Sequence, residues 1–126
     1  MRMVGVAGAV AGTLAVGLGA FGAHALADVL DARGVELWRT ATLYLFIHAL
    51  VLLFITSLAQ RGERRLLRVA SGFCMVGILL FCGSLYALAL NAPRWLGALT
   101  PLGGVALLLS WLSLAAAFHF AKTEPH

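Results

Sequence analysis

The sequence predicts an all-α membrane protein: a single domain, residues 1–126, that bundles four transmembrane helices and has a short interfacial helix after the first span. Its composition is the first reason, since 62% of the 126 residues are hydrophobic, 11% are charged and the mean hydropathy is +0.98. Soluble domains carry roughly 25% charged residues. The second reason is that residues 3–27, 40–60, 69–93 and 95–121 contain no charged side chain. Each run has at least the roughly 20 residues that a helix needs to cross the hydrocarbon. None shows the alternation of apolar and polar residues that is typical of a transmembrane β-strand.

The first span, residues 3–26, carries small residues at steps of three and four. They form one stripe that lets another helix approach closely, and they are Gly5, Gly8, Gly12, Ala15, Gly19 and Gly22. The stripe alone does not decide between a partner helix in the same chain and one in another subunit. We expect a homo-oligomer that forms through it, or a subunit of a larger membrane complex.

A cleaved secretory signal is the alternative for this span, because Arg2 precedes it and Ala23-His24-Ala25 resembles a cleavage site. Its uncharged run is longer than the 7–15 residues of a signal core. We therefore expect it to be a retained helix.

The next segments follow from capping and interface signals. Residues 28–38 mix apolar and charged side chains, which is typical of an interfacial helix, with Asp28 as its cap and Gly34 as its end. Trp38 is expected at the headgroups. The second and third spans cover residues 39–59 and 67–90. Thr100 and Pro101 resemble an N-cap and a first helical residue, so the fourth span covers residues 101–121.

Orientation follows from the basic residues. One side of the membrane receives Arg2, Arg61, Arg64, Arg65, Arg68 and Lys122, and the other receives Arg33, Arg39 and Arg94. The positive-inside rule then places both termini in the cytoplasm. The arginines of residues 60–68 are expected to contact anionic lipid, and the net charge of +4 is not taken as a sign of nucleic-acid binding.

Several polar and aromatic residues fall inside the outer half of the spans, where polar groups are costly and mark candidate sites. If the helices close into one bundle, they would line an outward-opening pocket: His24, Tyr44, His48, Ser84, Tyr86 and Trp111. In the alternative interpretation each group is satisfied locally, His24 in the headgroups and His48 by a neighbouring helix. The sequence leaves both open.

The sequence offers little support for a catalytic or cofactor-binding site. No carboxylate lies inside a span, no nucleophile–base set can be assembled, and Cys74 and Cys82 have no metal-ligand spacing. His24 and His48 differ by about 10 Å in depth on straight helices, which disfavours bis-histidine haem ligation. We expect no enzyme activity, no metal and no cofactor.

Four motifs resemble one known family: "GAFGAHAL" (19–26), "WRTATLYLFIHAL" (38–50), "GILLFCGSLYALAL" (77–90) and "LGALTPLGG" (96–104). They resemble the bacterial inner-membrane family called domain of unknown function 423, which is similar to the transmembrane protein 256 group. The resemblance implies a small four-helix protein of the bacterial inner membrane with no established activity. His24, Tyr44, His48 and residues 83–86 match the family pattern, whereas Cys82 stands where the family often has another small residue.

The expected function is that of a non-enzymatic accessory or scaffold component that binds a lipid, a quinone-like molecule or a larger membrane complex. A small oligomeric transporter or channel is the alternative. The alternative needs a continuous wetted path, and the polar groups gather only in the outer half of the spans. The position of these polar groups does not argue against a pore that forms between subunits.

Overall fold

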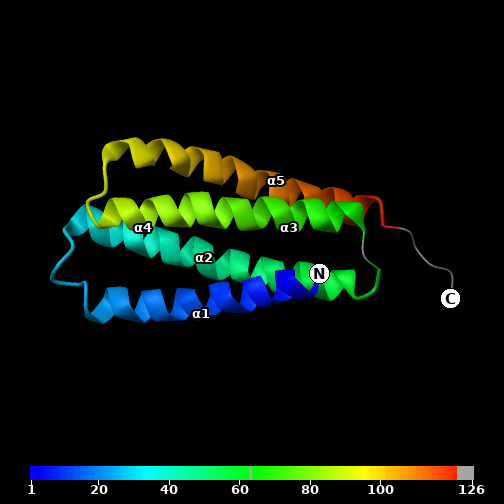
Figure 1. The fold of residues 1–126 in the computed structure, drawn as a ribbon, viewed down its shortest axis with the longest axis horizontal. Helices are drawn as coiled ribbons and strands as arrows, with labels where there is room; N and C mark the ends of the chain where they lie inside the picture. Colours follow the sequence, from blue (N-terminus) through cyan, green and yellow to red (C-terminus); the bar gives the residue numbers. More distant parts are fainter. Residues whose placement is uncertain (63, 122–126) are drawn as a thin grey trace.

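The computed structural model describes residues 1–62 and 64–121, so Lys122 of the predicted basic set lies outside the described part. Within these described residues, four helical segments are long and apolar enough to cross a membrane. They are α1 (Arg2–His24), α2 (Ala32–Ala59), a rod of α3 (Arg65–Gly77), the π-helix η1 (Ile78–Cys82) and α4 (Gly83–Ala89), and a rod of the 3-10 helix η2 (Arg94–Ala98) and α5 (Leu99–His119) (Figure 1). The predicted class, an all-α protein with four membrane-length helices, is confirmed.

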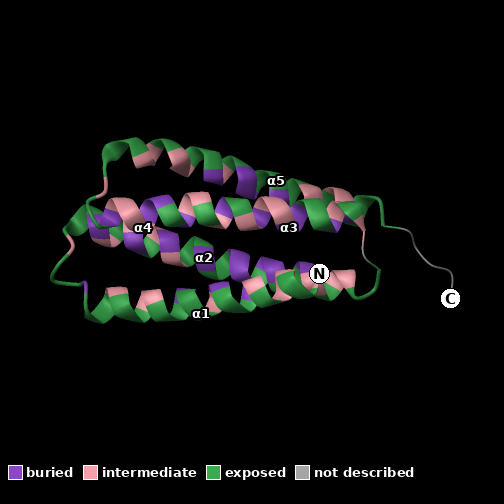
Figure 2. Ribbon diagram, viewed as in Figure 1, coloured by how far each residue is buried: buried purple, intermediate pink, exposed green. Residues whose placement is uncertain are grey.

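The four rods lie side by side in a row, in the order α1, α2, α3–α4 and α5 (Figure 1). α1 packs on α2, the α3–α4 rod packs between α2 and α5, and α1 has no comparable contact with the other two rods. Figure 2 shows the consequence: buried positions concentrate on α2 and the α3–α4 rod, while most of α1 is exposed. The predicted pocket assumed helices that close around a centre, and the row does not provide that closure.

The predicted glycine stripe faces α2 of the same chain. A Cβ on Gly8 would lie 3.0 Å from the Leu52 Cβ and 3.1 Å from the Ala49 carbonyl oxygen. The four other stripe glycines also face α2: Gly5 at Thr56, Gly12 at Ala49, Gly19 at Thr42 and Gly22 at Trp38. Of the two partners that the sequence left open for the stripe, the structure shows α2 of the same chain, and the formation of an oligomer stays a prediction.

The separate interfacial helix predicted for residues 28–38 is not present. The Asp31 carboxylate accepts a 2.7 Å hydrogen bond from the Gly34 N–H, which makes Asp31, and not Asp28, the N-cap of α2. Gly34 does not end a helix. It lies buried in the first turn of α2, where a Cβ would approach the Ala89 carbonyl oxygen to 3.2 Å. Since no breaker follows Gly34, one helix continues through Trp38 into the span.

The fourth span also begins earlier than predicted. η2 leads directly into α5 at Leu99, so Thr100 is not an N-cap. Pro101 is tolerated in this first turn because its missing N–H would have no helical partner there. Two residues on, Gly103 lies so close to the backbone of Phe81 that a Cβ would overlap it. This contact brings α5 directly onto η1.

Candidate functional site

The residues predicted to share one pocket separate into three hydrogen-bonded groups and one exposed position. They are His48 with Tyr44 and Trp111, Ser84 with Thr100, Tyr86 with Thr42, and His24 alone. His24 is exposed as the last residue of α1. The row of helices explains why His24 lies apart, because α1 has no comparable contact with the α3–α4 rod or α5.

His48 lies buried at the middle of α2 with both ring nitrogens in contact with other groups. Nδ1 lies 2.8 Å from the Tyr44 carbonyl oxygen, and the Trp111 indole N–H donates to Nε2 over 3.1 Å. An indole nitrogen only donates, so Nε2 must be the acceptor and Nδ1 must carry the proton. His48 is thus a neutral imidazole that links α5 to α2 by a hydrogen bond. This agrees with the alternative interpretation, in which a neighbouring helix satisfies His48.

A shallow groove of about 410 Å³ lies beside this histidine between α2, η1 and α5. Its aromatic walls include Tyr44 and Phe81, whose ring centroids are 4.5 Å apart. Within residues 1–62 and 64–121, the Tyr44 hydroxyl makes no hydrogen bond. Tyr44 is therefore the one member of the predicted pocket that keeps a donor open to a groove.

Tyr86 belongs to a second group that joins three rods. Its hydroxyl lies 2.6 Å from the Thr42 hydroxyl, which in turn donates to the Trp38 carbonyl oxygen over 2.9 Å. The Trp38 indole, expected in the headgroups, is instead buried against Gly22, and its N–H donates to the Leu18 carbonyl oxygen over 2.8 Å. The stripe glycine makes room for this indole, so Trp38 is a packing residue and not an interfacial anchor.

Ser84 and Thr100 form the remaining pair. The two hydroxyls are 2.5 Å apart, and Ser84 also donates to the Phe81 carbonyl oxygen over 3.0 Å. Deeper between α3 and α5, the buried Ser110 hydroxyl donates to the Ala70 carbonyl oxygen over 2.7 Å. These hydroxyls connect neighbouring helices.

The arginines expected to contact lipid have different surroundings. Arg64 donates over 2.7 Å to the Ala117 carbonyl oxygen in the last turn of α5. The N–H of Ala121, which would take that oxygen in a longer helix, bonds to Phe118 instead. Arg64 is thus a helix C-cap across two rods. The side chains of Arg61, Arg65 and Arg68 are exposed at the same end of the molecule.

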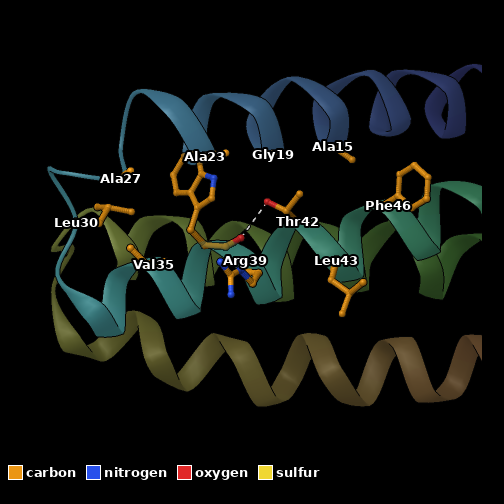
Figure 3. Close-up of a pocket in the computed structure, with 12 residues that line it drawn as sticks. Ala15, Gly19, Ala23, Ala27, Leu30, Val35, Arg39, Thr42, Leu43 and Phe46 are labelled. Atoms are coloured by element: carbon orange, nitrogen blue, oxygen red, sulfur yellow. Dashed lines mark hydrogen bonds between the residues drawn. The ribbon is translucent and has the colours of Figure 1, made fainter.

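A different feature has the form of a ligand site: a groove of about 570 Å³ between α1 and α2, at the end opposite the chain termini (Figure 3). We call it the Arg39 groove. α1 lines it with residues that have little or no side chain: Ala15, Gly19, Gly22 and Ala23. α2 contributes larger side chains, with Arg39 at the end of the span and Leu43 and Phe46 deeper.

Arg39 makes no hydrogen bond or ion pair with any described residue. It stands at the border of the uncharged run 40–60, where a helix passes from headgroups into hydrocarbon. In the sequence, Arg39 contributes only to the predicted orientation. The small residues of α1 were the sequence signal that could have indicated the groove. Which residues of α2 lie opposite them depends on the register of the two helices, and the sequence does not give that register.

No group of three or more His, Cys, Asp or Glu side chains in residues 1–62 and 64–121 is arranged to hold a metal ion. Cys74 and Cys82 are buried, and the Cys74 thiol lies 3.7 Å from the His48 carbonyl oxygen. Both cysteines occupy the core as small side chains.

Comparison with known proteins gives a consistent family. The family model described as "Protein of unknown function (DUF423)" matches residues 18–104. The UPF0382 membrane protein YwdK of Bacillus subtilis is 41% identical and covers 93% of this chain and 96% of its own. A UPF0382 membrane protein of Haemophilus influenzae is 38% identical over 85% of this chain and 86% of its own. No solved structure matches. With its four membrane-length helices, the chain therefore belongs to the DUF423 family of multi-pass UPF0382 membrane proteins.

Proposed function

We propose that the protein is a non-enzymatic accessory component of the bacterial inner membrane that holds a lipid molecule in the Arg39 groove. The observation that carries this proposal is the pairing of an apolar, small-residue wall with one arginine that has no partner among the described residues. A lipid has the same division into an apolar chain and a polar headgroup. Membrane helices that leave such a space expose it to the surrounding lipid.

The polar side chains of the spans support a structural role over catalysis. His48, Ser84, Tyr86 and Ser110 each hydrogen-bond another helix or a backbone carbonyl. A catalytic acid, base or nucleophile needs a free position that faces substrate. Tyr44 has an open hydroxyl, but a base or acid partner is not beside it, since His48 uses both nitrogens in the structure.

The same bonds disfavour the alternative of a transporter or channel. A conduit needs polar groups that face water along a continuous path. In the described residues these groups form separate pairs within the row, and the groove between the inner halves of α2 and α5 has apolar walls such as Leu50, Phe54 and Leu114. We also propose that both termini face the cytoplasm, which the distribution of the described arginines supports.

Lipid analysis of the purified protein tests the proposal. The wild-type chain, extracted in mild detergent, is expected to retain lipid, and Ala23→Leu is expected to release it because the new side chain fills the Arg39 groove. Ala20→Leu is the matched control, since Ala20 is exposed on α1 but does not line the groove. Equal lipid in all three proteins, or none in the wild type, would refute the proposal.

A flux assay separates the alternative. Liposomes that contain the pure protein are expected to stay tight to ions and small solutes. Specific flux that His48→Ala abolishes would instead favour a conduit.

A further inference from the structure

We infer that the Arg39 groove selects an anionic phospholipid, whose phosphate is bound by Arg39 and whose acyl chain lies against the small residues of α1. This inference rests on the proposed function and names the class of lipid. It assigns the lipid to the leaflet at the end of the molecule opposite the termini.

The dimensions of the groove fit part of one acyl chain. From Arg39 to Phe46, α2 rises by about 10 Å, and Ala15 to Ala23 of α1 spans a similar length beside it. One leaflet contributes about 15 Å of hydrocarbon. The groove therefore accompanies a chain from the headgroup through roughly two thirds of its leaflet and ends before the bilayer middle.

The position of Arg39 fits a phosphate. A guanidinium presents five N–H donors in a planar fork that binds phosphate oxygens in pairs. In the structure none of these donors contacts a described residue. The other two basic residues at this end, Arg33 and Arg94, line a separate cavity of about 220 Å³ that also contains Asp31. Arg39 is thus the basic residue that lines this groove.

The local charge favours an anionic over a zwitterionic headgroup. Glu36, one turn before Arg39, forms no ion pair with it, and the Asp31 carboxylate accepts the Gly34 N–H. The positive charge of Arg39 is therefore not neutralised by a neighbouring carboxylate in contact. A phosphatidylglycerol headgroup supplies one negative charge, whereas a phosphatidylcholine headgroup adds its own cation beside the arginine.

Native mass spectrometry tests the selection. The protein is released from micelles that contain equal amounts of phosphatidylglycerol and phosphatidylcholine with identical chains. The wild type is expected to retain more phosphatidylglycerol, and Arg39→Gln is expected to lower the retained ratio about five-fold, the effect of one arginine at a lipid surface. Arg39→Lys should keep part of the preference, and Arg94→Gln should keep all of it. Free glycerol phosphate should not displace the lipid, because the chain contributes to binding.

Two further outcomes distinguish the inference from the proposed function. If Ala23→Leu releases lipid but Arg39→Gln leaves the ratio unchanged, the groove holds lipid without charge selection and the inference fails alone. If Ala23→Leu releases nothing, both fail. Should Ala23→Leu not fold, Ala27→Leu takes its place, because Ala27 lines the same groove from the exposed connection after α1.

Discussion

The Trp111 indole N–H reaches across from α5 to Nε2 of His48 on α2, over 3.1 Å. The ring planes meet at 76° with centroids 6.0 Å apart. A histidine inside a membrane span suggests a proton carrier or a ligand. Here His48 is a neutral crosslink, because Nε2 accepts a hydrogen bond from Trp111 and Nδ1 donates one to the Tyr44 carbonyl oxygen.

Removal of this crosslink should weaken the fold. Trp111→Phe keeps an aromatic ring but leaves Nε2 of His48 without a donor. We expect the free energy of unfolding in detergent to fall by about 1 kcal/mol, the usual range for interhelical hydrogen bonds in membranes. Trp95→Phe is the control, because Trp95 is exposed, and it should change stability little. Equal effects of the two substitutions would contradict the crosslink.

The glycine stripe predicts opposite effects of one substitution at two positions of α1. Gly22→Ala introduces a Cβ into the space of the Trp38 indole, and overpacking of this kind costs about 1–3 kcal/mol. Gly17→Ala has nothing within 4 Å, so it should stabilise α1 by roughly 0.5–1 kcal/mol through helix propensity. Thermal unfolding in the same detergent compares the two. A destabilised Gly17→Ala variant would indicate that this second face of α1 also packs on something.

Arg64 should matter for stability more than its neighbour Arg61. Arg64→Gln replaces a cation that caps α5 at Ala117, and we expect a loss of about 1–2 kcal/mol, as for a hydrogen bond to a charged group. Arg61→Gln removes the same charge from an exposed position. If both variants unfold alike while both lose affinity for anionic vesicles, Arg64 acts on lipid and not as a cap.

The orientation of the protein in the membrane can be measured with exposed cysteines that are introduced one at a time. Asp28 follows α1 and Gln60 follows α2, both residues are exposed, and because the two helices are antiparallel a cysteine at each position reports on an opposite end of the helices. A membrane-impermeant maleimide added to spheroplasts should label position 28 and spare position 60, because the arginine-rich end is expected in the cytoplasm. Cys74 and Cys82 are buried, so the wild-type chain is the unlabelled control. Labelling at position 60 would reverse the topology.

The sequence predicts the spans well because each span is a local property. Residues 40–60 carry no charge, and α2 covers them as far as Ala59, but it begins at Ala32. The error at the connection came from the caps. Asp28 and Asp31 are equivalent as sequence signals, and Gly34 resembles a breaker, until the close approach of α2 to Ala89 shows why a glycine is needed inside the helix.

The candidate site is predicted less well. Counted along their spans, His48 and Trp111 fall at similar depths near the middle of the membrane, and the structure brings them together. Depth follows from the 1.5 Å rise per residue, so it can be counted along the chain. Lateral position cannot be counted, which is why His24 was grouped with residues that lie elsewhere in the row.

The sequence by itself determined the medium, the helical class and the number of spans, because the cost of a charge in hydrocarbon falls on each segment whatever its neighbours are. Only the tertiary structure decided which faces meet: the glycine stripe against α2, His48 against Trp111, and Arg39 against open space beside α1. The physical reason is rotational. Lipid is as apolar as leucine, so hydropathy does not orient a helix about its axis, and close packing and hydrogen bonds between particular side chains must do so.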